Sequence, residues 1–188
     1  MKKFLRFGAA SAVVAASLGM STVAHAQDSA QADAFAEILT ALTLELDTGS
    51  SLDFGAMVIT GAGTVSLDAA TGTLDCSAAA IVCSGTTELA AFSITTGTAL
   101  KNVTIVFDTP TATLLRAGGT IGDAADELEL SNLNSDAALV ADPLGDFYQV
   151  ALDGVGTAGF LVGGDLAFDG SEVAGVYQGT FTVSVEYT

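Results

Sequence analysis

The sequence predicts an all-β protein, a single antiparallel β-sandwich that follows a cleavable signal peptide. Short runs of alternating apolar and polar residues recur along the chain, glycine-containing turns separate them, and proline occurs only at Pro110 and Pro143. Alternation is typical of strands with one buried face, and glycine supplies the positive φ that hairpin turns require. The 162 residues that follow the signal suit one domain with a core of ordinary size.

Residues 1–26 have the three parts of a secretory signal peptide. Three basic residues stand in the first six positions, an apolar and small-residue stretch runs from Phe7 to Leu18, and Ala24-His25-Ala26 ends the segment. This pattern predicts cleavage before Gln27. The apolar stretch is shorter than the roughly 20 residues that a membrane-spanning helix needs, so we expect an exported protein without a membrane span.

Cleavage leaves a strongly acidic chain. The only histidine is lost, and Lys101 and Arg116 remain against 22 acidic residues, for a net charge of about −20. Such a chain repels nucleic acid phosphates and anionic lipids, which excludes both as partners on electrostatic grounds. We expect no cofactor. Calcium remains an alternative, at the glycine-flanked stretch Asp165–Asp169, although its ligand spacing matches no known loop.

Residues 27–48 are predicted to form an N-terminal extension and first strand, ahead of a sandwich body at 49–188. From Ala30 to Leu46 the even positions are apolar apart from one threonine, which is a period of two. The alanine-rich part, Ser29–Ala41, also suits a helix. As one strand, Ala30–Leu46 would be about 56 Å long, against about 40 Å for a compact domain, so part of it would project beyond the sandwich.

The body contains eight runs with strand character and one longer loop, at Leu139–Asp146. The eight runs are Ser51–Ile59, Thr64–Asp68, Ala90–Thr95, Asn102–Asp108, Glu127–Leu133, Phe147–Leu152, Phe160–Phe168 and Val176–Tyr187. No linker or second composition divides them, so one domain is expected.

Cys76 and Cys83 are the only cysteines, with six residues between them. In an oxidising compartment an isolated pair at this spacing predicts a disulfide across a local loop. The spacing excludes a CxxC redox pair, and a metal site would need further ligands that a chain without histidine lacks.

The C-terminal run alternates up to the end of the chain. Phe181, Val183, Val185 and Tyr187 share one face, and polar residues occupy the other. A regular final strand exposes edges that another strand can pair with, and proteins either protect such edges or use them.

In this run the sequence resembles subunits of chaperone/usher-assembled pili. Those subunits end in an alternating strand with a penultimate aromatic, here Tyr187, and a glycine fourteen residues from the C-terminus, here Gly175. The resemblance implies an immunoglobulin-like, pilin-like sandwich that lacks its last strand and is completed by the N-terminal extension of the next subunit. It also implies three partners: a periplasmic chaperone, an outer-membrane usher, and copies of the chain or related subunits.

Two sets of residues receive roles from this resemblance. The assembly strand would consist of Gly175, Phe181, Val183, Val185 and Tyr187, and the donor side chains would be Ala30, Ala32, Ala34, Ala36 and Ile38. The chain departs from the pilin pattern in two respects, because pilin donor strands usually carry larger apolar residues and a glycine, and residues 28–48 contain no glycine.

Over its mature length the chain also resembles a family of exported bacterial proteins, domain-of-unknown-function family 4402. The resemblance rests on four motifs: Leu52-Asp53-Phe54-Gly55, Gly63-Thr64-Val65, Val162-Gly163-Gly164-Asp165-Leu166, and the stretch from Gly175 to Val183 that contains Tyr177 and Gly179-Thr180-Phe181-Thr182. That family is similar in layout to pilin-type subunits.

The mature chain lacks the residues of most catalytic sites. Without histidine or free cysteine, it cannot form Ser/His/Asp, Cys/His or zinc sites. Carboxylate pairs remain open, but Asp123 and Asp126-Glu127 lie in a solvated stretch rich in glycine and alanine. No glycine-rich stretch is followed by Lys-Ser/Thr, so a phosphate loop is excluded. We therefore expect a protein that is not an enzyme.

The expected function is a structural subunit of a bacterial surface filament assembled by donor-strand complementation. After passage through the periplasm it would be located at the cell surface or outside the cell. The alternative is a self-complete adhesion module of the cell surface or matrix. Calcium is the metal ion that such a module would bind, if it binds one. A carboxylate-based hydrolase is a third hypothesis.

Overall fold

A computed structural model describes residues 30–188 of the chain. The signal peptide and its cleavage site lie outside the described residues. By their contacts, the residues up to Glu37 and the residues Ile38–Thr188 form two separate units. In the first unit, residues 30–37 have no regular secondary structure and expose their side chains, so the helix considered for Ser29–Ala41 is absent from the described part of that segment.

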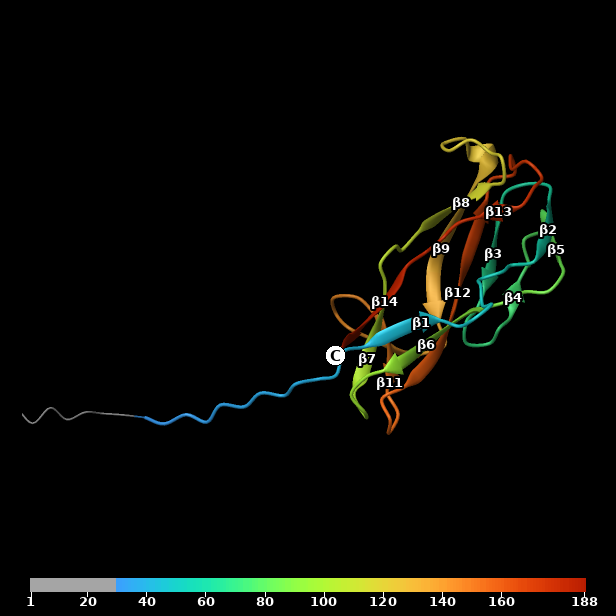
Figure 1. Cartoon of the computed structure of the whole chain (residues 1–188). Helices are drawn as coiled ribbons and strands as arrows, with labels where there is room; N and C mark the ends of the chain where they lie inside the picture. Colours follow the sequence, from blue (N-terminus) through green and yellow to red (C-terminus); the bar gives the residue numbers. More distant parts are fainter. Residues whose placement is uncertain (1–29) are drawn as a thin grey trace, which may run out of the picture. The chain divides into compact units, whose positions relative to one another are not determined.

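The second unit, the body, is built from three antiparallel sheets (Figure 1). The largest has the order β1 (Thr43–Leu46), β6 (Ala90–Thr96), β12 (Ala158–Phe168), β9 (Glu127–Ser135), β8 (Ala112–Arg116), β13 (Tyr177–Gln178), with β3 (Gly63–Leu67) and β4 (Leu74–Asp75) branching from β12. The second has the order β10 (Ala138–Val140), β11 (Phe147–Ala151), β7 (Asn102–Phe107), β14 (Val183–Tyr187). The third pairs β2 (Ala56–Ile59) with β5 (Ile81–Ser84), and one short 3-10 turn, η1 (Ala124–Asp126), precedes β9.

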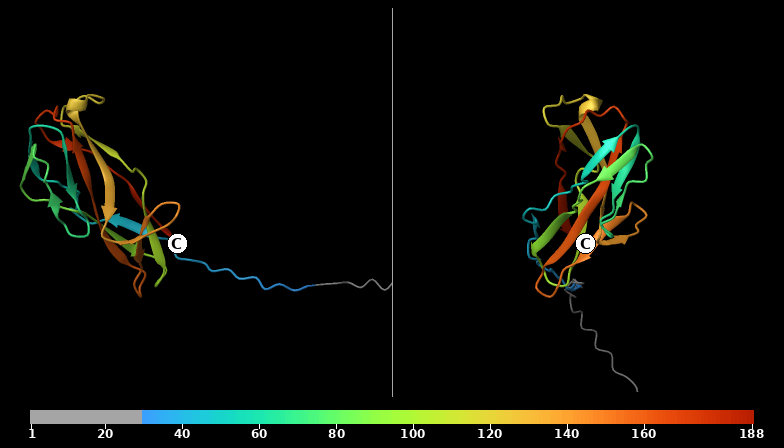
Figure 2. Two further views of the ribbon diagram at one scale, coloured as in Figure 1. Left: turned by 180° about the vertical axis from the view of Figure 1, so that it is seen from behind. Right: turned by 90° about the vertical axis from the view of Figure 1, so that its right-hand side faces the viewer.

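The core lies between the curled large sheet and the other two. Strand β12 is its centre, because alternate residues of β12 are buried and the strand pairs with β3, β6 and β9. Val103 and Ile105 of β7 join the same buried cluster from the second sheet, and Phe54 and Ile81 join it from the segments around the small β2–β5 sheet. That small sheet lies beside β3 and β4 in both the front and the rear view (Figure 2). The predicted all-β sandwich is confirmed.

The C-terminal run differs from its prediction in being two strands. Residues 177–178 pair with β8 in the large sheet, whereas residues 183–187 pair with β7 in the second sheet. Their partners β7 and β8 likewise lie in different sheets, and the connection between these two strands contains Pro110. Proline has no N–H to donate to a ladder, so a ladder is readily broken there.

Other differences concern short strands. The expected run Ser51–Ile59 forms only β2 and one isolated bridge at Asp53, and the expected loop at Leu139–Asp146 contains the end of β10. Strands β4, β5 and β8 were not among the eight predicted runs. Among residues 30–188 the structure contains no helix of the length and apolarity needed to cross a membrane.

The predicted disulfide is confirmed. Cys76 and Cys83 are joined, with their Cα atoms 6.2 Å apart. Cys76 follows β4 and Cys83 lies in β5 opposite Met57. The bond therefore fastens the small sheet to the segment that follows β4, and its partly buried sulfur atoms pack against the core.

We expect the double substitution Cys76→Ala and Cys83→Ala to lower the free energy of unfolding by about 2 to 3 kcal/mol, the chain-entropy value for so short a loop. Urea denaturation measures the change. The unaltered protein unfolded under a reducing agent is the control and should show the same loss. Equal midpoints for the oxidised protein and the variant would contradict the prediction.

Candidate functional site

Strand β14 is hydrogen-bonded on one side only. The amide of Thr188 donates to the carbonyl oxygen of Asn102, and the amide of Asp108 donates to that of Thr182. Along an antiparallel strand, the N–H and C=O groups of successive residues point alternately to the two sides. The even-numbered residues of β14 therefore point their N–H and C=O groups toward β7. The backbone groups of Val183, Val185 and Tyr187 therefore point to the opposite edge, where no other strand lies among the described residues.

The inward face of the C-terminal run is incompletely covered. Phe181, Val183, Val185 and Tyr187 all pack against the core, yet none of them is fully buried. The ring of Phe181 meets that of Phe92 in β6 edge to face, with centroids 6.4 Å apart. The segment that leads into β14 therefore packs on β6 of the large sheet, and its apolar side chains remain partly exposed.

Strand β1 is the second open edge, because it pairs with β6 and with no other strand. Leu42 stands just before this strand, and Leu44 and Leu46 lie within it, all at even-numbered positions. Leu42 and Leu44 pack against the core, but Leu46 remains 52% exposed. We use the name seam for the region between the free edges of β1 and β14, lined by these leucines and by Phe92, Phe181, Val183 and Val185.

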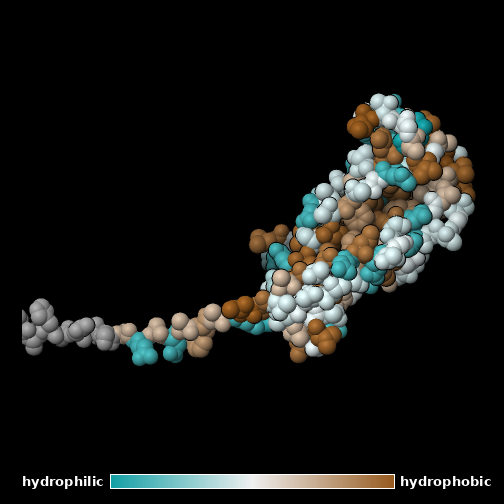
Figure 3. All heavy atoms as spheres, viewed as in Figure 1, coloured by the Kyte–Doolittle hydropathy of each residue, from teal (hydrophilic) through white to brown (hydrophobic). Residues whose placement is uncertain are grey.

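The hydropathy surface shows an apolar hollow on this side of the body (Figure 3). A band of brown atoms runs along the body between two paler rims that carry teal patches. Apolar side chains at the bottom of an open hollow contribute less stability than fully buried ones, because stabilisation scales with the apolar area removed from water. The hollow is thus a surface that another apolar strand would cover favourably.

Tyr187 closes the lower end of the seam. Its hydroxyl donates to the carbonyl oxygen of Thr40 at 2.7 Å and accepts from the amide of Thr98 at 2.6 Å. These two bonds connect the last strand to the segment before β1 and to the loop after β6. The penultimate aromatic therefore has a structural role near the start of the body.

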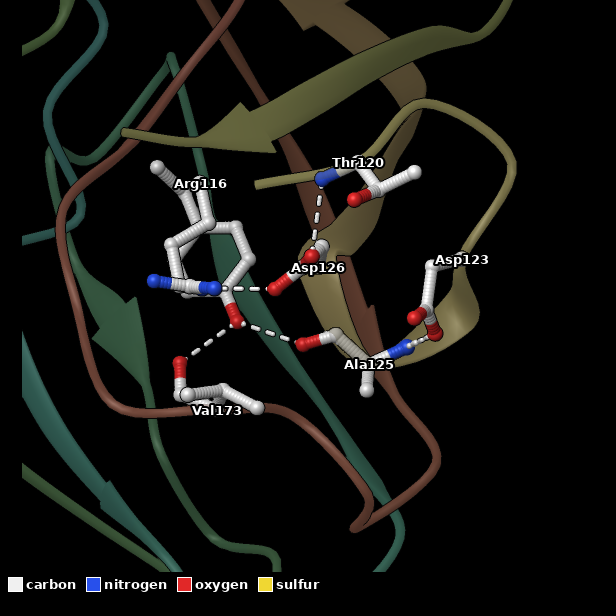
Figure 4. Close-up of polar contacts among 7 residues, drawn as sticks. Arg116, Thr120, Asp123, Ala125, Asp126 and Val173 are labelled. Carbon is white, nitrogen blue, oxygen red and sulfur yellow. Dashed lines mark hydrogen bonds and ion pairs between the residues drawn. The ribbon is translucent and has the colours of Figure 1, made fainter. Parts of the chain in front are cut away.

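Gly175 lies at the opposite end, against Arg116. A Cβ added at Gly175 would lie 2.8 Å from both Cγ and Cδ of Arg116, so any side chain there would displace the arginine stem. The arginine is held in turn by Asp126, whose carboxylate accepts from Nε at 2.6 Å and from the amide of Thr120 at 2.8 Å (Figure 4). A side chain at position 175 would therefore disturb the pairing of Arg116 with Asp126.

A tyrosine completes the cluster. The hydroxyl of Tyr177 is 2.7 Å from the carbonyl oxygen of Val173 and 3.0 Å from that of Ala125, and its one proton is shared between the two oxygens. Burial raises the pKa of Tyr177, which keeps the hydroxyl protonated and able to donate. The network ties the segment after β12 to η1 and to the end of β8.

The charges in this cluster stabilise each other. The hydrogen bond from Arg116 and the amide of Thr120 lower the pKa of Asp126, and the hydrogen bond to Asp126 raises the pKa of Arg116. Asp123 and Glu127, the other carboxylates considered for catalysis, accept from the amides of Ala125 and Gly122. All three carboxylates thus order the loop around η1.

The predicted donor residues occupy the other unit or its boundary. Ala30, Ala32, Ala34 and Ala36 are exposed and belong to the unit that ends at Glu37, and Ile38 is exposed at the start of the body. Their role as donors stays a prediction.

The stretch considered for calcium does not bring its carboxylates together. Asp165 accepts from Ser66 Oγ at 2.5 Å and from Asn132 Nδ2 at 2.9 Å, across three neighbouring strands. Asp169 instead accepts from the amide of Ser171. Within residues 30–188 no group of three or more cysteine, aspartate, glutamate or histidine side chains is placed to hold a metal ion.

Sequence reasoning missed the pair of Arg116 and Asp126. One signal was present, because Arg116 is one of two basic residues left in a chain with 22 acids. A scarce cation in such a chain is a candidate for a specific carboxylate partner. The choice of partner among so many acids depended on the fold.

The lowered pKa of Asp126 predicts a pH-dependent contribution to stability. A carboxyl group whose pKa is lower in the folded protein stabilises it above its unfolded pKa, about 3.9, and this stabilisation is lost as pH falls through the folded pKa. The variant Asp126→Asn should melt at a lower temperature than the unaltered protein near pH 7, with the difference shrinking below about pH 4. Thermal unfolding followed by circular dichroism measures this.

Asp123→Asn is the matched control, because Asp123 is a neighbouring exposed carboxylate that accepts from the amide of Ala125 and not from Arg116. The melting temperature of this variant should change less at pH 7. A difference between Asp126→Asn and the unaltered protein that stays constant down to pH 2 would contradict the assignment.

Comparison with known proteins gives one match. None of the curated proteins and none of the solved structures matches the chain significantly. One family model, described as Domain of unknown function (DUF4402), matches residues 44–187. The match begins in β1 and ends at Tyr187, so it contains both edges of the seam. Since it covers most of the chain, the protein belongs to the DUF4402 family.

Proposed function

We propose that this protein is a structural subunit of a bacterial surface filament, in which the N-terminal extension of one copy adds a strand to the seam of the next. The observation that carries the proposal is the pair of free strand edges, β1 and β14, with half-exposed apolar side chains between them. A free edge offers backbone hydrogen bonds, and the apolar hollow offers a surface for alternate side chains.

The extension has the pattern that such a site requires. The even positions from Ala30 to Ile38 are all apolar, in the same parity as the inward-facing Leu42 and Leu44. Nine residues in extended conformation span about 30 Å, the length of a long strand. Small alanine side chains suit a hollow whose floor is already filled by Phe92 and Phe181.

In this proposal the protein has no catalytic role and no cofactor. The signal peptide directs export, a periplasmic chaperone covers the seam before assembly, and an outer-membrane usher passes the subunits to the cell surface. A net charge of about −20 in the mature chain opposes binding to nucleic acid and to anionic membranes.

A self-complete surface or matrix adhesion module is the second candidate. It is favoured by one observation, which is that among the described residues every buried polar side-chain atom has a hydrogen-bond partner. The body thus has a satisfied core before any strand is added. The experiments below separate the two candidates.

The parity of the extension predicts which substitutions block assembly. Ala34→Asp would bury a carboxylate in the seam, at a large cost because no partner compensates it. It should abolish concentration-dependent, SDS-resistant oligomers of the mature protein. Phe35→Asp, one position along and on the opposite face, is the control and should leave them. Gel electrophoresis of unheated samples measures both. The reverse result would contradict the assignment of the even positions.

Removal of residues 27–36 tests the extension as a whole. The shortened protein should fold, since its body keeps the core, and should form no SDS-resistant oligomers on its own. It keeps the seam, so it should still accept the extension of an intact copy and appear as the terminal member of a mixed oligomer. A monomeric mature protein that unfolds reversibly and gives no such oligomers would sink the filament proposal, and a melting temperature raised by calcium would favour the adhesion module.

A further inference from the structure

Two loops at the lower end of the body expose large aliphatic side chains. The loop 97–101 connects β6 to β7 and the loop 152–157 connects β11 to β12; together they form what we call the lower pole (Figure 1). Leu100 is 79% exposed and Val155 is 80% exposed. The loops adjoin, because the amide of Leu100 donates to the carbonyl oxygen of Asp153.

The lower pole is a constrained surface. Asp153 accepts from the amides of Val155 and Thr157, and a Cβ at Gly156 would lie 2.1 Å from the carbonyl oxygen of Gly97, so the two loops touch backbone to backbone. Leu100 has φ 60°, a left-handed conformation that is costly for a branched aliphatic residue. The hydrogen bonds and the close backbone contact therefore fix both loops, and with them the exposed positions of Leu100 and Val155.

The upper end of the body has a similar character. The loop 117–123 and the segment 170–176 form the upper pole, and they expose Ile121, Val173 and Val176, with Ile121 82% exposed. The cluster around Arg116 and Asp126 fixes these two segments relative to each other, since the amide of Val173 donates to the carbonyl oxygen of Ala125 and that of Ala117 to Val176. At both poles, exposed aliphatic residues thus stand on loops that backbone hydrogen bonds join to each other.

Charge also favours a contact at the poles. The mature chain carries about 20 net negative charges, so copies of it repel one another over most of their surfaces. The two loops of the lower pole contain one acid, Asp153, and one base, Lys101, and are locally neutral. The upper-pole segments contain two acids, Asp123 and Glu172, so a contact with the neutral lower pole meets less repulsion than a contact between two acidic faces.

We propose that copies of this protein stack head to tail, with Leu100 and Val155 of one copy packed on Ile121, Val173 and Val176 of the next. The inference rests on the proposed strand donation. The extension leaves the body at Thr40, beside the lower pole, and the bonds of Tyr187 close the lower end of the seam. A donor strand therefore enters its neighbour's seam from the upper end, which brings the donor's lower pole to the neighbour's upper pole.

Site-directed cross-linking of the full mature protein tests the contact. One preparation carries Val155→Cys and a second carries Ile121→Cys, and equal amounts are mixed and oxidised mildly. The native cysteines are already paired, so only the introduced thiols react. Leu144→Cys, which is 99% exposed in the β10–β11 hairpin, replaces Ile121→Cys in the control mixture. Thermal unfolding of each variant verifies that it is folded.

The expected result is a disulfide-linked heterodimer of Val155→Cys with Ile121→Cys, several-fold more abundant than in the control mixture or in either variant alone. Equal yields in all mixtures would overturn the head-to-tail contact, whether or not SDS-resistant oligomers form. Selective cross-linking without SDS-resistant oligomers would keep the contact and refute strand donation. SDS-resistant oligomers with unselective cross-linking would keep strand donation and refute the contact.

Discussion

The backbone hydrogen bonds of the last strand are the constraint on which the candidate site depends. Strand β14 is the edge of the second sheet and pairs only with β7. It holds this position because the chain passes from one sheet to the other at Pro110, and again between β13 and residue 183. Backbone groups at such an edge must find water or another strand. The seam and its half-covered leucines follow from that topology, and so does the use we propose for it.

Most of the fold could be predicted from local pattern. The runs that became β7, β9 and β12 alternate over part of their length, because one of their faces is buried in the core. Strand β8 was missed since Leu114 and Leu115 stand side by side and break the alternation. The division of the C-terminal run into β13 and β14 depends on which distant strand each half pairs with, and a local pattern carries no information on that.

The candidate site was predictable in part. Alternation singled out the inward face of the last strand, and the resemblance to pilus subunits drew attention to Gly175 and Tyr187. The roles of these two residues depend on contacts with distant parts of the chain. Gly175 makes room for Arg116, and Tyr187 forms hydrogen bonds with Thr40 and Thr98. The ion pair between Arg116 and Asp126 could not be predicted, because nothing in the sequence distinguishes Asp126 from the other acidic residues as the partner of Arg116.

The pairing of β3 with β12 has a consequence for the order of events during synthesis. Ser66 and Asp165, which bond across that pair, are 99 positions apart in the sequence. Contacts of such separation make folding slow, because a long loop must close before they form. Strand β3 therefore gains its partner in the centre of the large sheet only after β12 has been made. Its pairing with β4 and the disulfide loop that follows β4 need no distant residue, so both can form earlier.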